Sequence, residues 1–166
     1  MMDCKKALVE TNADLEAAID LMRASGAAKA AKKAGRVASE GLVNVAISDD
    51  NKNAVILEVN SETDFVTKGQ SFVDFVNALG KLALKNRPES VETFLTQKLE
   101  SGETVDEARE GIIAKIGENV SVRRLQNVST ENGVLGSYKH GDRIAVLVVI
   151  SGKDSDLAKD IAMHIA

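Results

Sequence analysis

Residues 43–66 read VNVAISDDNKNAVILEVNSETDFV, and this stretch decides the predicted fold. Two sets of alternating apolar residues occupy it: Val43, Val45 and Ile47, then Val55, Leu57 and Val59. Alternation with a period of two is typical of β-strands with one buried face. The DDNKN segment between the two sets has the composition of a turn. The stretch therefore predicts a β-hairpin.

Downstream, the period of the apolar residues becomes helical. A predicted core helix carries five of them, Phe72, Phe75, Val76, Leu79 and Leu82, and ends near Asn86 before Pro88. A short helix is expected over residues 90–99. Thr104 and Glu107 form a capping box that opens a further helix, which Gly117 ends. Its inward face is expected to carry Val105, Ala108, Ile112 and Ile116.

Strand patterns return after residue 117. Val120 and Val122 lie in one predicted strand, and the Asn132-Gly133 pair predicts a tight hairpin to a partner strand over residues 134–140. Residues 144–150 are apolar on both alternating faces, which predicts a central strand covered on two sides. A last helix is expected from about Asp154, with one apolar face made of Leu157, Ile161 and Ile165.

The N-terminal part is predicted to be a separate helical piece. We expect one helix over residues 3–10 and a second from Asn12, as N-cap, to Gly26, with an apolar stripe of Leu15, Ala18, Ile19 and Met22. About two dozen residues cannot close a core alone, which suggests that a first helix is missing. We therefore predict a partial helical module over 1–25, an Ala/Lys helical connector over 26–38 and an α+β core domain over 39–166.

Bulk composition narrows the class of function. The net charge of −4 argues against global attraction to nucleic acid or anionic membrane, although a local basic patch could exist. A single cysteine and two histidines cannot form an internal disulfide or a closed zinc site. No stretch is long and apolar enough to predict a membrane span, and no signal peptide is recognised. We expect a cytoplasmic protein with a core made mainly of aliphatic side chains.

The motifs of common active sites are missing from the sequence. There is no Gly-Lys-Ser/Thr phosphate loop and no three-glycine dinucleotide fingerprint. His140 and His164 lack the spacing of a metal pair or of a nucleophile and base. Cys4 beside Lys5 could be an activated thiol, but a small packing residue is the better interpretation. We predict that the chain is not an enzyme and holds no metal or cofactor.

Two charged groups allow a functional and a plain interpretation. Lys29, Lys32, Lys33 and Arg36 have helical spacing and could bind an acidic surface or RNA, but a solvated helix face is favoured. The acidic residues are Asp49, Asp50, Glu58, Glu62 and Asp64. They could suggest metal or paired-acid chemistry, but they lack a calcium-loop pattern, and turn or capping roles explain them more simply.

The turn at residues 58–66, EVNSETDFV, places an acid beside an aromatic residue at a strand-to-helix junction. In one interpretation the turn is exposed and Phe65 contacts a partner. In the other, Thr63 or Asp64 caps the helix while Phe65 packs on the same apolar face as Phe72. Composition and spacing favour neither.

The stretch LEVNSETDFV at residues 57–66 resembles the signature of the elongation factor Ts family. Other blocks resemble the family in the expected order: MMDCKKAL at 1–8, AKAAKKAG at 28–35, AKIGEN at 114–119, LGSYKHG at 135–141 and IAMHIA at 161–166. The similarity spans nearly the whole chain. It implies an α+β core with an antiparallel sheet, and an N-terminal module of the ubiquitin-associated type.

The resemblance also implies a function and a set of contact residues. Members of the family release GDP from elongation factor Tu. The resemblance therefore implies elongation factor Tu as the partner, in its GDP-bound and nucleotide-free states. The nucleotide and the magnesium ion would belong to that partner. Phe65 would be the wedge near the magnesium site, with Asp64 beside it in the Thr-Asp-Phe-Val motif. Further partner contacts would be made by Thr63, Val66, Ile116, Gly117, His140 and Lys5.

The chain also departs from the family pattern. The resemblance implies an additional helix before Met1 and a second half of the core after Ala166, neither of which is present in these 166 residues. Ser61 and Glu62 precede the motif at positions where relatives carry other residues, and we expect this change to tune the contact. A module that binds the partner without displacing nucleotide is the main alternative.

Overall fold

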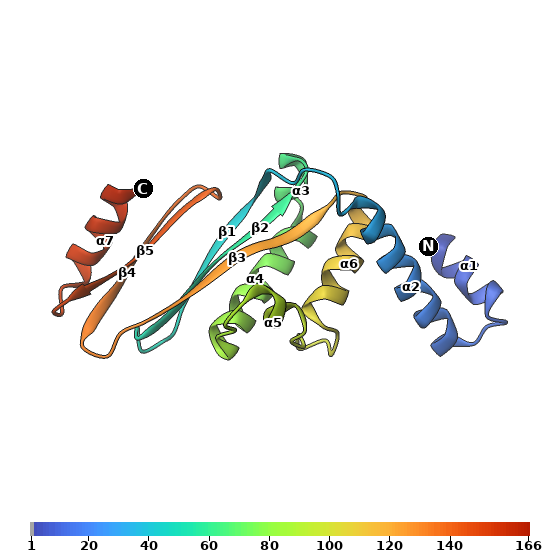
Figure 1. The fold of residues 1–166 in the computed structure, drawn as a ribbon, viewed down its shortest axis with the longest axis horizontal. Coiled ribbons are helices and arrows are strands. Elements are labelled where there is room, and N and C mark those ends of the chain that lie inside the picture. The colour runs from blue at the N-terminus through green and yellow to red at the C-terminus, as the bar shows by residue number, and fades with distance from the viewer. Residues whose placement is uncertain (1) are drawn as a thin grey trace.

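The computed structural model describes residues 2–166, so Met1, the first residue of the predicted N-terminal module, lies outside the described part. The molecule is elongated, with the N-terminal helices at one end and the C-terminal helix at the other (Figure 1). Its elements are α1 Met2–Glu10, α2 Leu15–Lys33, β1 Glu40–Ile47, β2 Asn53–Ser61, α3 Asp64–Thr67, α4 Gln70–Asn86, α5 Val91–Leu95, α6 Val105–Ile116, β3 Val120–Ser129, β4 Gly133–His140, β5 Ile144–Ser151 and α7 Ser155–Ile165. Antiparallel sheets packed against helices make the fold α+β, as predicted.

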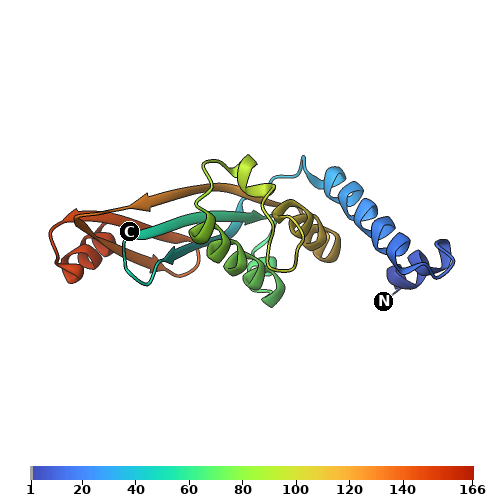
Figure 2. The same ribbon diagram turned by 90° about the horizontal axis from the view of Figure 1, so that it is seen from below.

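The β1–β2 hairpin is confirmed and forms part of a three-stranded antiparallel sheet of order β1-β2-β3. Helices α4, α5 and α6 lie against this sheet (Figure 2). The core between the layers contains aliphatic residues of all three strands together with Phe72, Phe75 and Phe94. Three of the four phenylalanines are therefore buried in one core.

Three helix termini in this unit follow the sequence signals closely. The capping box of Thr104 and Glu107 is present at the start of α6, where each side chain accepts from the other residue's backbone N–H. Gly117 ends α6 with φ of 84°, a left-handed conformation that glycine adopts without steric cost. Helix α4 ends at Asn86, as predicted.

The prediction of a hairpin at Asn132-Gly133 is wrong. Strand β3 pairs with β2, whereas β4 pairs only with β5 in a separate two-stranded sheet. The chain thus turns from one sheet into another at this point. A turn signal reports that the chain reverses locally, but which strands then pair depends on side chains distant in sequence.

Strand β5 is not the predicted central strand. It lies in a two-stranded sheet and its residues are half-buried or exposed, including Ile144 and Val149. Helix α7 begins after its N-cap Asp154, as predicted, but it buries Ala158 and Ala162. The predicted inward residues lie outside that contact, because Leu157 is 49% and Ile165 is 60% exposed while Ile161 is only half-buried.

The predicted bounds of the second helix, from an N-cap at Asn12 to an end at Gly26, are also wrong. Asn12 has φ of 53° and lies in the turn, and the N-cap is Asp14, whose side chain accepts from the Ala17 N–H. Helix α2 then continues through Gly26 to Lys33. Gly26 is buried where α2 packs on α6, and a Cβ there would lie 4.0 Å from that of Ala114. Gly26 therefore lies inside a helix at a helix–helix contact and does not end the helix.

The apolar stripe predicted for the second helix is only partly covered. Ala18 is buried, whereas Leu15 is 65% and Ile19 is 42% exposed. Helix α1 packs on α2 and buries little beyond Ala7. The ubiquitin-associated character of this module stays a prediction.

Candidate functional site

Phe65 is the exposed aromatic residue of the strand-to-helix turn. It lies on α3, a helix of only four residues, and is 80% exposed. The next residue, Val66, is buried in the core and anchors α3 from below. The alternative in which Phe65 shares the buried face of Phe72 is therefore wrong, because successive helical side chains point about 100° apart and Val66 occupies the inward position.

The start of α3 is capped from another part of the chain. Thr63 is the N-cap residue, but its side chain makes no capping hydrogen bond. Instead, Glu118 accepts a bond of 2.9 Å from the Thr63 N–H and one of 2.7 Å from the Thr63 hydroxyl. A carboxylate from the α6–β3 connection thus satisfies an N–H group that a cap would otherwise serve.

A second carboxylate makes the reciprocal contact. Glu62 accepts a bond of 2.6 Å from the backbone N–H of Asn119. We call the four residues Glu62, Thr63, Glu118 and Asn119 the carboxylate clasp. Arg36 lies 3.5 Å from Glu62, and its carbonyl accepts a bond of 2.8 Å from the Asn119 side chain. The clasp therefore joins the α3 turn, the α6–β3 connection and the end of the connector.

Asp64 lies beside Phe65 and is paired within its own helix. Lys68 donates a bond of 2.8 Å to Asp64 and lies 5.8 Å from the centre of the Phe65 ring. The hydrogen bond and charge of Lys68, with a smaller contribution from the charge of Arg143, hold the pKa of Asp64 below its ordinary value. Arg143 belongs to the turn between β4 and β5, so this turn comes close to α3.

The remaining residues predicted to contact a partner lie in three places. Ile116 and Gly117 directly precede the clasp residues, and the carbonyl of Gly117 accepts a bond from Lys33. His140 is exposed at the end of β4, where its Nδ1 lies 3.2 Å from the Tyr138 hydroxyl. Lys5 lies apart from both, on α1, which packs against α2 at the N-terminal end of the molecule (Figures 1 and 2). Thr63, Asp64, Phe65 and Val66 form the centre of the candidate site.

Sequence reasoning missed Glu118 and Lys68. Lys68 follows Asp64 by four residues, a spacing that favours an ion pair on a helix and could have indicated the contact. Glu118 is 55 residues from Thr63, and no local pattern predicts a pairing over that separation.

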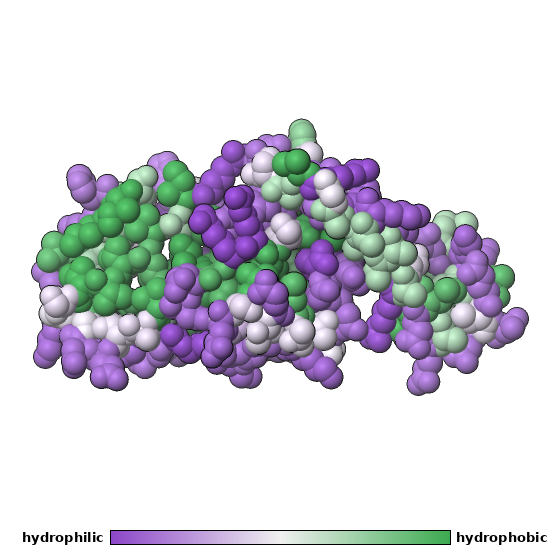
Figure 3. Space-filling view, viewed as in Figure 1, coloured by the Kyte–Doolittle hydropathy of each residue, from purple (hydrophilic) through white to green (hydrophobic). Residues whose placement is uncertain are grey.

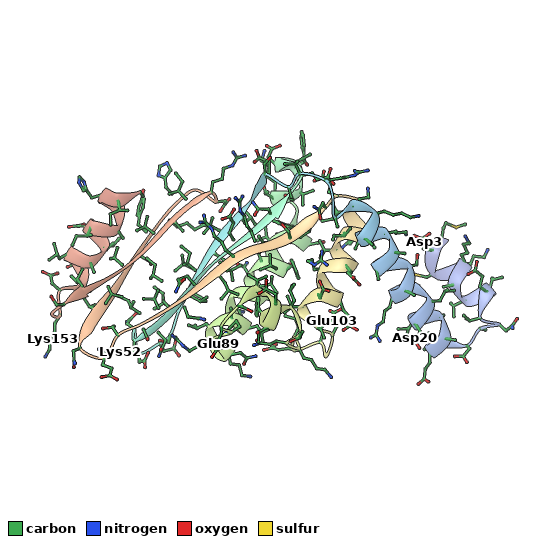
Figure 4. The ribbon with its side chains drawn as sticks, viewed as in Figure 1. Asp3, Asp20, Lys52, Glu89, Glu103 and Lys153 are labelled. Atoms are coloured by element: carbon green, nitrogen blue, oxygen red, sulfur yellow. The ribbon has the colours of Figure 1, made fainter. Side chains whose placement is uncertain are left out.

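Cys4 and the basic series Lys29, Lys32, Lys33 and Arg36 were the other candidates for a functional role. Cys4 is exposed on α1. Lys29 pairs with Asp3 at 3.8 Å, and Arg36 and Lys33 make the contacts given above, so most of the basic series is engaged within the chain. Figure 4 marks Asp3 at the N-terminal end and Lys52 at the opposite end of the molecule.

No group of three or more His, Cys, Asp or Glu side chains suited to a metal ion occurs among residues 2–166. Within the same residues, no helix is both long and apolar enough to cross a bilayer. The site offers an exposed ring, a carboxylate and an ammonium group on a short, externally braced helix. Such a surface suits contact with another macromolecule.

The sequence is similar to proteins of a known family. The family model described as elongation factor TS matches residues 62–166, which include the clasp and α3. Elongation factor Ts of Ruthia magnifica subsp. Calyptogena magnifica is 64% identical over all 166 residues, which cover 56% of that relative. The elongation factor Ts of Methylococcus capsulatus is 53% identical, again over the whole of this chain and 57% of its own length.

The chain belongs to the elongation factor Ts family, a family of translation elongation factors. It spans a little over half the length of the curated relatives that it matches.

Proposed function

We propose that this chain takes part in guanine-nucleotide exchange on elongation factor Tu, promoting GDP release by placing Phe65 in the nucleotide domain near the magnesium site. The observation that carries the proposal is the position of Phe65, a ring 80% exposed on a helix whose neighbouring residue is buried. Family membership supports the choice of partner.

Exchange requires no covalent chemistry from this chain. A protein that binds the nucleotide-free partner more tightly than the loaded partner weakens nucleotide binding by the same factor, because linkage is reciprocal. Each tenfold weakening needs about 1.4 kcal/mol of differential binding. A buried aromatic ring at the centre of an interface typically contributes more than that. One well-placed ring is therefore enough to produce a measurable effect.

The surroundings of Phe65 suit this role. A phenylalanine has few rotatable bonds, so little conformational entropy is lost when its ring enters a pocket. Lys68 beside the ring donates a hydrogen bond to Asp64, which orients the carboxylate before contact. Asp64 would then meet the partner as a charged group, and both GDP and magnesium would be supplied by the partner.

The decisive experiment is the rate of fluorescent GDP release from elongation factor Tu with the full-length protein and its Phe65→Ala variant. We expect the stimulated rate to fall by about tenfold or more, since the ring would be central to the interface. Thermal unfolding should change little, because the ring makes few internal contacts.

Phe94→Ala is the matched control, since the same substitution there removes a fully buried ring and should lower stability. Equal release rates for the original protein and Phe65→Ala would contradict the proposed role of the ring. Binding without any acceleration of release, by the original protein, would instead favour an interaction module that does not exchange nucleotide.

A further inference from the structure

Helix α3 cannot hold its own orientation. It has four residues, which is far below the length at which an isolated helix is stable in water. Its N-cap residue makes no side-chain capping bond. Val66 fixes the helix from below, and the buried Ser61 hydroxyl donates a bond of 3.1 Å to the Thr63 carbonyl just before it. The direction in which Phe65 points must therefore be set by contacts from outside the helix.

Glu118 makes two of those contacts. Both of its carboxylate oxygens bond to Thr63, one at the backbone N–H and one at the hydroxyl. Two bonds from one planar group to one residue fix orientation as well as distance, and bonds to an ionised acceptor are stronger than neutral ones. Gly117, in its left-handed conformation, reverses the chain at the end of α6, so that Glu118 reaches the α3 turn.

The reciprocal half of the clasp makes the arrangement stiffer. Glu62 bonds to the Asn119 N–H, so each of the two chain segments supplies one carboxylate and one backbone N–H to the other. Arg36 balances the charge of Glu62. No comparable charged partner is needed at Glu118, because the Thr63 N–H and hydroxyl satisfy its two oxygens.

From this geometry we infer that Glu118 is a positioning residue for Phe65: it holds the α3 turn so that the ring projects outward in the free protein. The inference rests on the proposed function of Phe65. It adds that the ring acts only when the clasp is closed, so that the α6–β3 connection contributes to exchange through α3. Glu118 itself need not touch the partner.

The experiment compares Glu118→Ala, Glu118→Gln and Glu131→Ala in the full-length protein. Glu131→Ala removes an exposed glutamate far from the clasp, for which no side-chain bond is found in the described residues. Glu118→Gln can keep both contacts, since its amide oxygen accepts from the Thr63 N–H and its NH₂ donates to the hydroxyl. Glu118→Ala loses both.

The first readout is hydrogen exchange at the Thr63 amide, which does not depend on activity. We expect Glu118→Ala to speed this exchange by about tenfold or more, with the Gln and Glu131 variants within about twofold of the original. The second readout is GDP release from elongation factor Tu. A loss of about tenfold is expected for Glu118→Ala, with recovery in Glu118→Gln.

A double-mutant cycle with Phe65→Ala separates positioning from direct contact. If Glu118 acts through the ring, Glu118→Ala should reduce release by less than about twofold once the ring is absent. Additive losses would overturn the inference, as would an unchanged amide exchange rate. Should Glu118→Ala fail to fold, Thr63→Val, which removes only the hydroxyl bond, must reduce release by about threefold for the inference to stand.

The two proposals fail in distinguishable ways. If Phe65→Ala leaves release unchanged, the proposed function fails, whatever the clasp does. If Phe65→Ala reduces release and Glu118→Ala does not, the proposed function stands and the positioning role of Glu118 is refuted.

Discussion

The β1-β2-β3 sheet and the β4–β5 sheet are both antiparallel and both carry apolar strands, yet they are packed differently. The first is covered by helices and encloses large side chains such as Phe72, Leu57 and Leu79. The second packs mainly against α7 and buries mainly Leu135, Ala158 and Ala162. Figure 3 shows apolar residues gathered on the visible surface over β4, β5 and α7.

The difference shows that a pattern of apolar residues predicts a strand, but not which helices or strands pack against its apolar face. In the three-stranded unit, α4 and α6 come from the same chain and bury the apolar face. In the two-stranded unit, five large apolar side chains are substantially exposed, Ile144, Val149, Leu157, Met163 and Ile165. The candidate site belongs to the well-covered unit, which gives Phe65 a rigid base.

The largest expected effect tests the core of the three-stranded unit. Phe72→Ala removes a fully buried ring and should lower the free energy of unfolding by about 3–5 kcal/mol, because a cavity remains. Phe65→Ala is the matched variant and should change the free energy of unfolding by less than about 0.5 kcal/mol. Urea unfolding followed by circular dichroism measures both, and similar losses would contradict the assigned difference in burial.

The second prediction concerns the packing of α7 on β4. A Cβ on Gly136 would lie 2.4 Å from the backbone carbonyl carbon of Ala158, which is too close for any side chain. Gly136→Ala should therefore displace α7 and cost about 1–3 kcal/mol. Hydrogen exchange should show lost protection in α7 and retained protection in α4.

Gly80→Ala is the control for that substitution. Its Cβ would meet the end of the Asn44 side chain, at 2.1 Å from Oδ1, and this flexible group can move away. We expect a smaller loss than for Gly136→Ala. Equal effects would show that the two units respond alike to crowding.

A third prediction compares the helix caps of the two units. Thr104→Ala removes the capping box of α6 and should lower stability by about 1 kcal/mol. Asp154→Ala removes the side-chain cap of α7, which accepts from the Leu157 N–H, and should cost a similar amount locally. Because α7 covers a smaller core, only Thr104→Ala should shift the global unfolding midpoint. A global shift by both variants would show that the units unfold together.

The smallest effect tests the junction between the units. Lys68→Met should raise the pKa of Asp64 towards its ordinary value, because the hydrogen bond and charge of Lys68 are the main causes of the lowered pKa. Arg143→Met should raise it less, since only a weaker charge effect from the β4–β5 turn is lost. A carboxyl pKa lowered by folding stabilises the protein above the unfolded pKa, and this contribution disappears as the pH falls through the folded pKa.

Titration of Asp64 by NMR measures both changes. Asp50 serves as the internal reference, since its lowered pKa has separate causes at Ser48 and Lys52. If Arg143→Met left the Asp64 pKa unchanged, the β4–β5 turn would not lie near α3 in solution.

Local signals predicted much of the fold. The β1–β2 hairpin, the end of α4 at Asn86, the capping box at Thr104 and the glycine end of α6 were all predicted correctly. Each depends on residues close together in the chain. The errors have a common cause. Gly26, Asn132 and the strand over residues 144–150 were interpreted from local pattern, whereas their outcome depends on contacts with distant segments.

The candidate site divides in the same way. The Thr63-Asp64-Phe65-Val66 motif and its place at a strand-to-helix junction were recognisable from the residues themselves. Composition and spacing left open whether Phe65 pointed inward or outward, and the family resemblance implied an outward ring. The structure shows the ring exposed, with Val66 in the core and Glu118 bonded to Thr63. Local preferences depend on neighbours in the chain, whereas burial and long-range hydrogen bonds depend on which segments meet in space. This is why residue identities revealed the motif, and three-dimensional packing revealed its orientation.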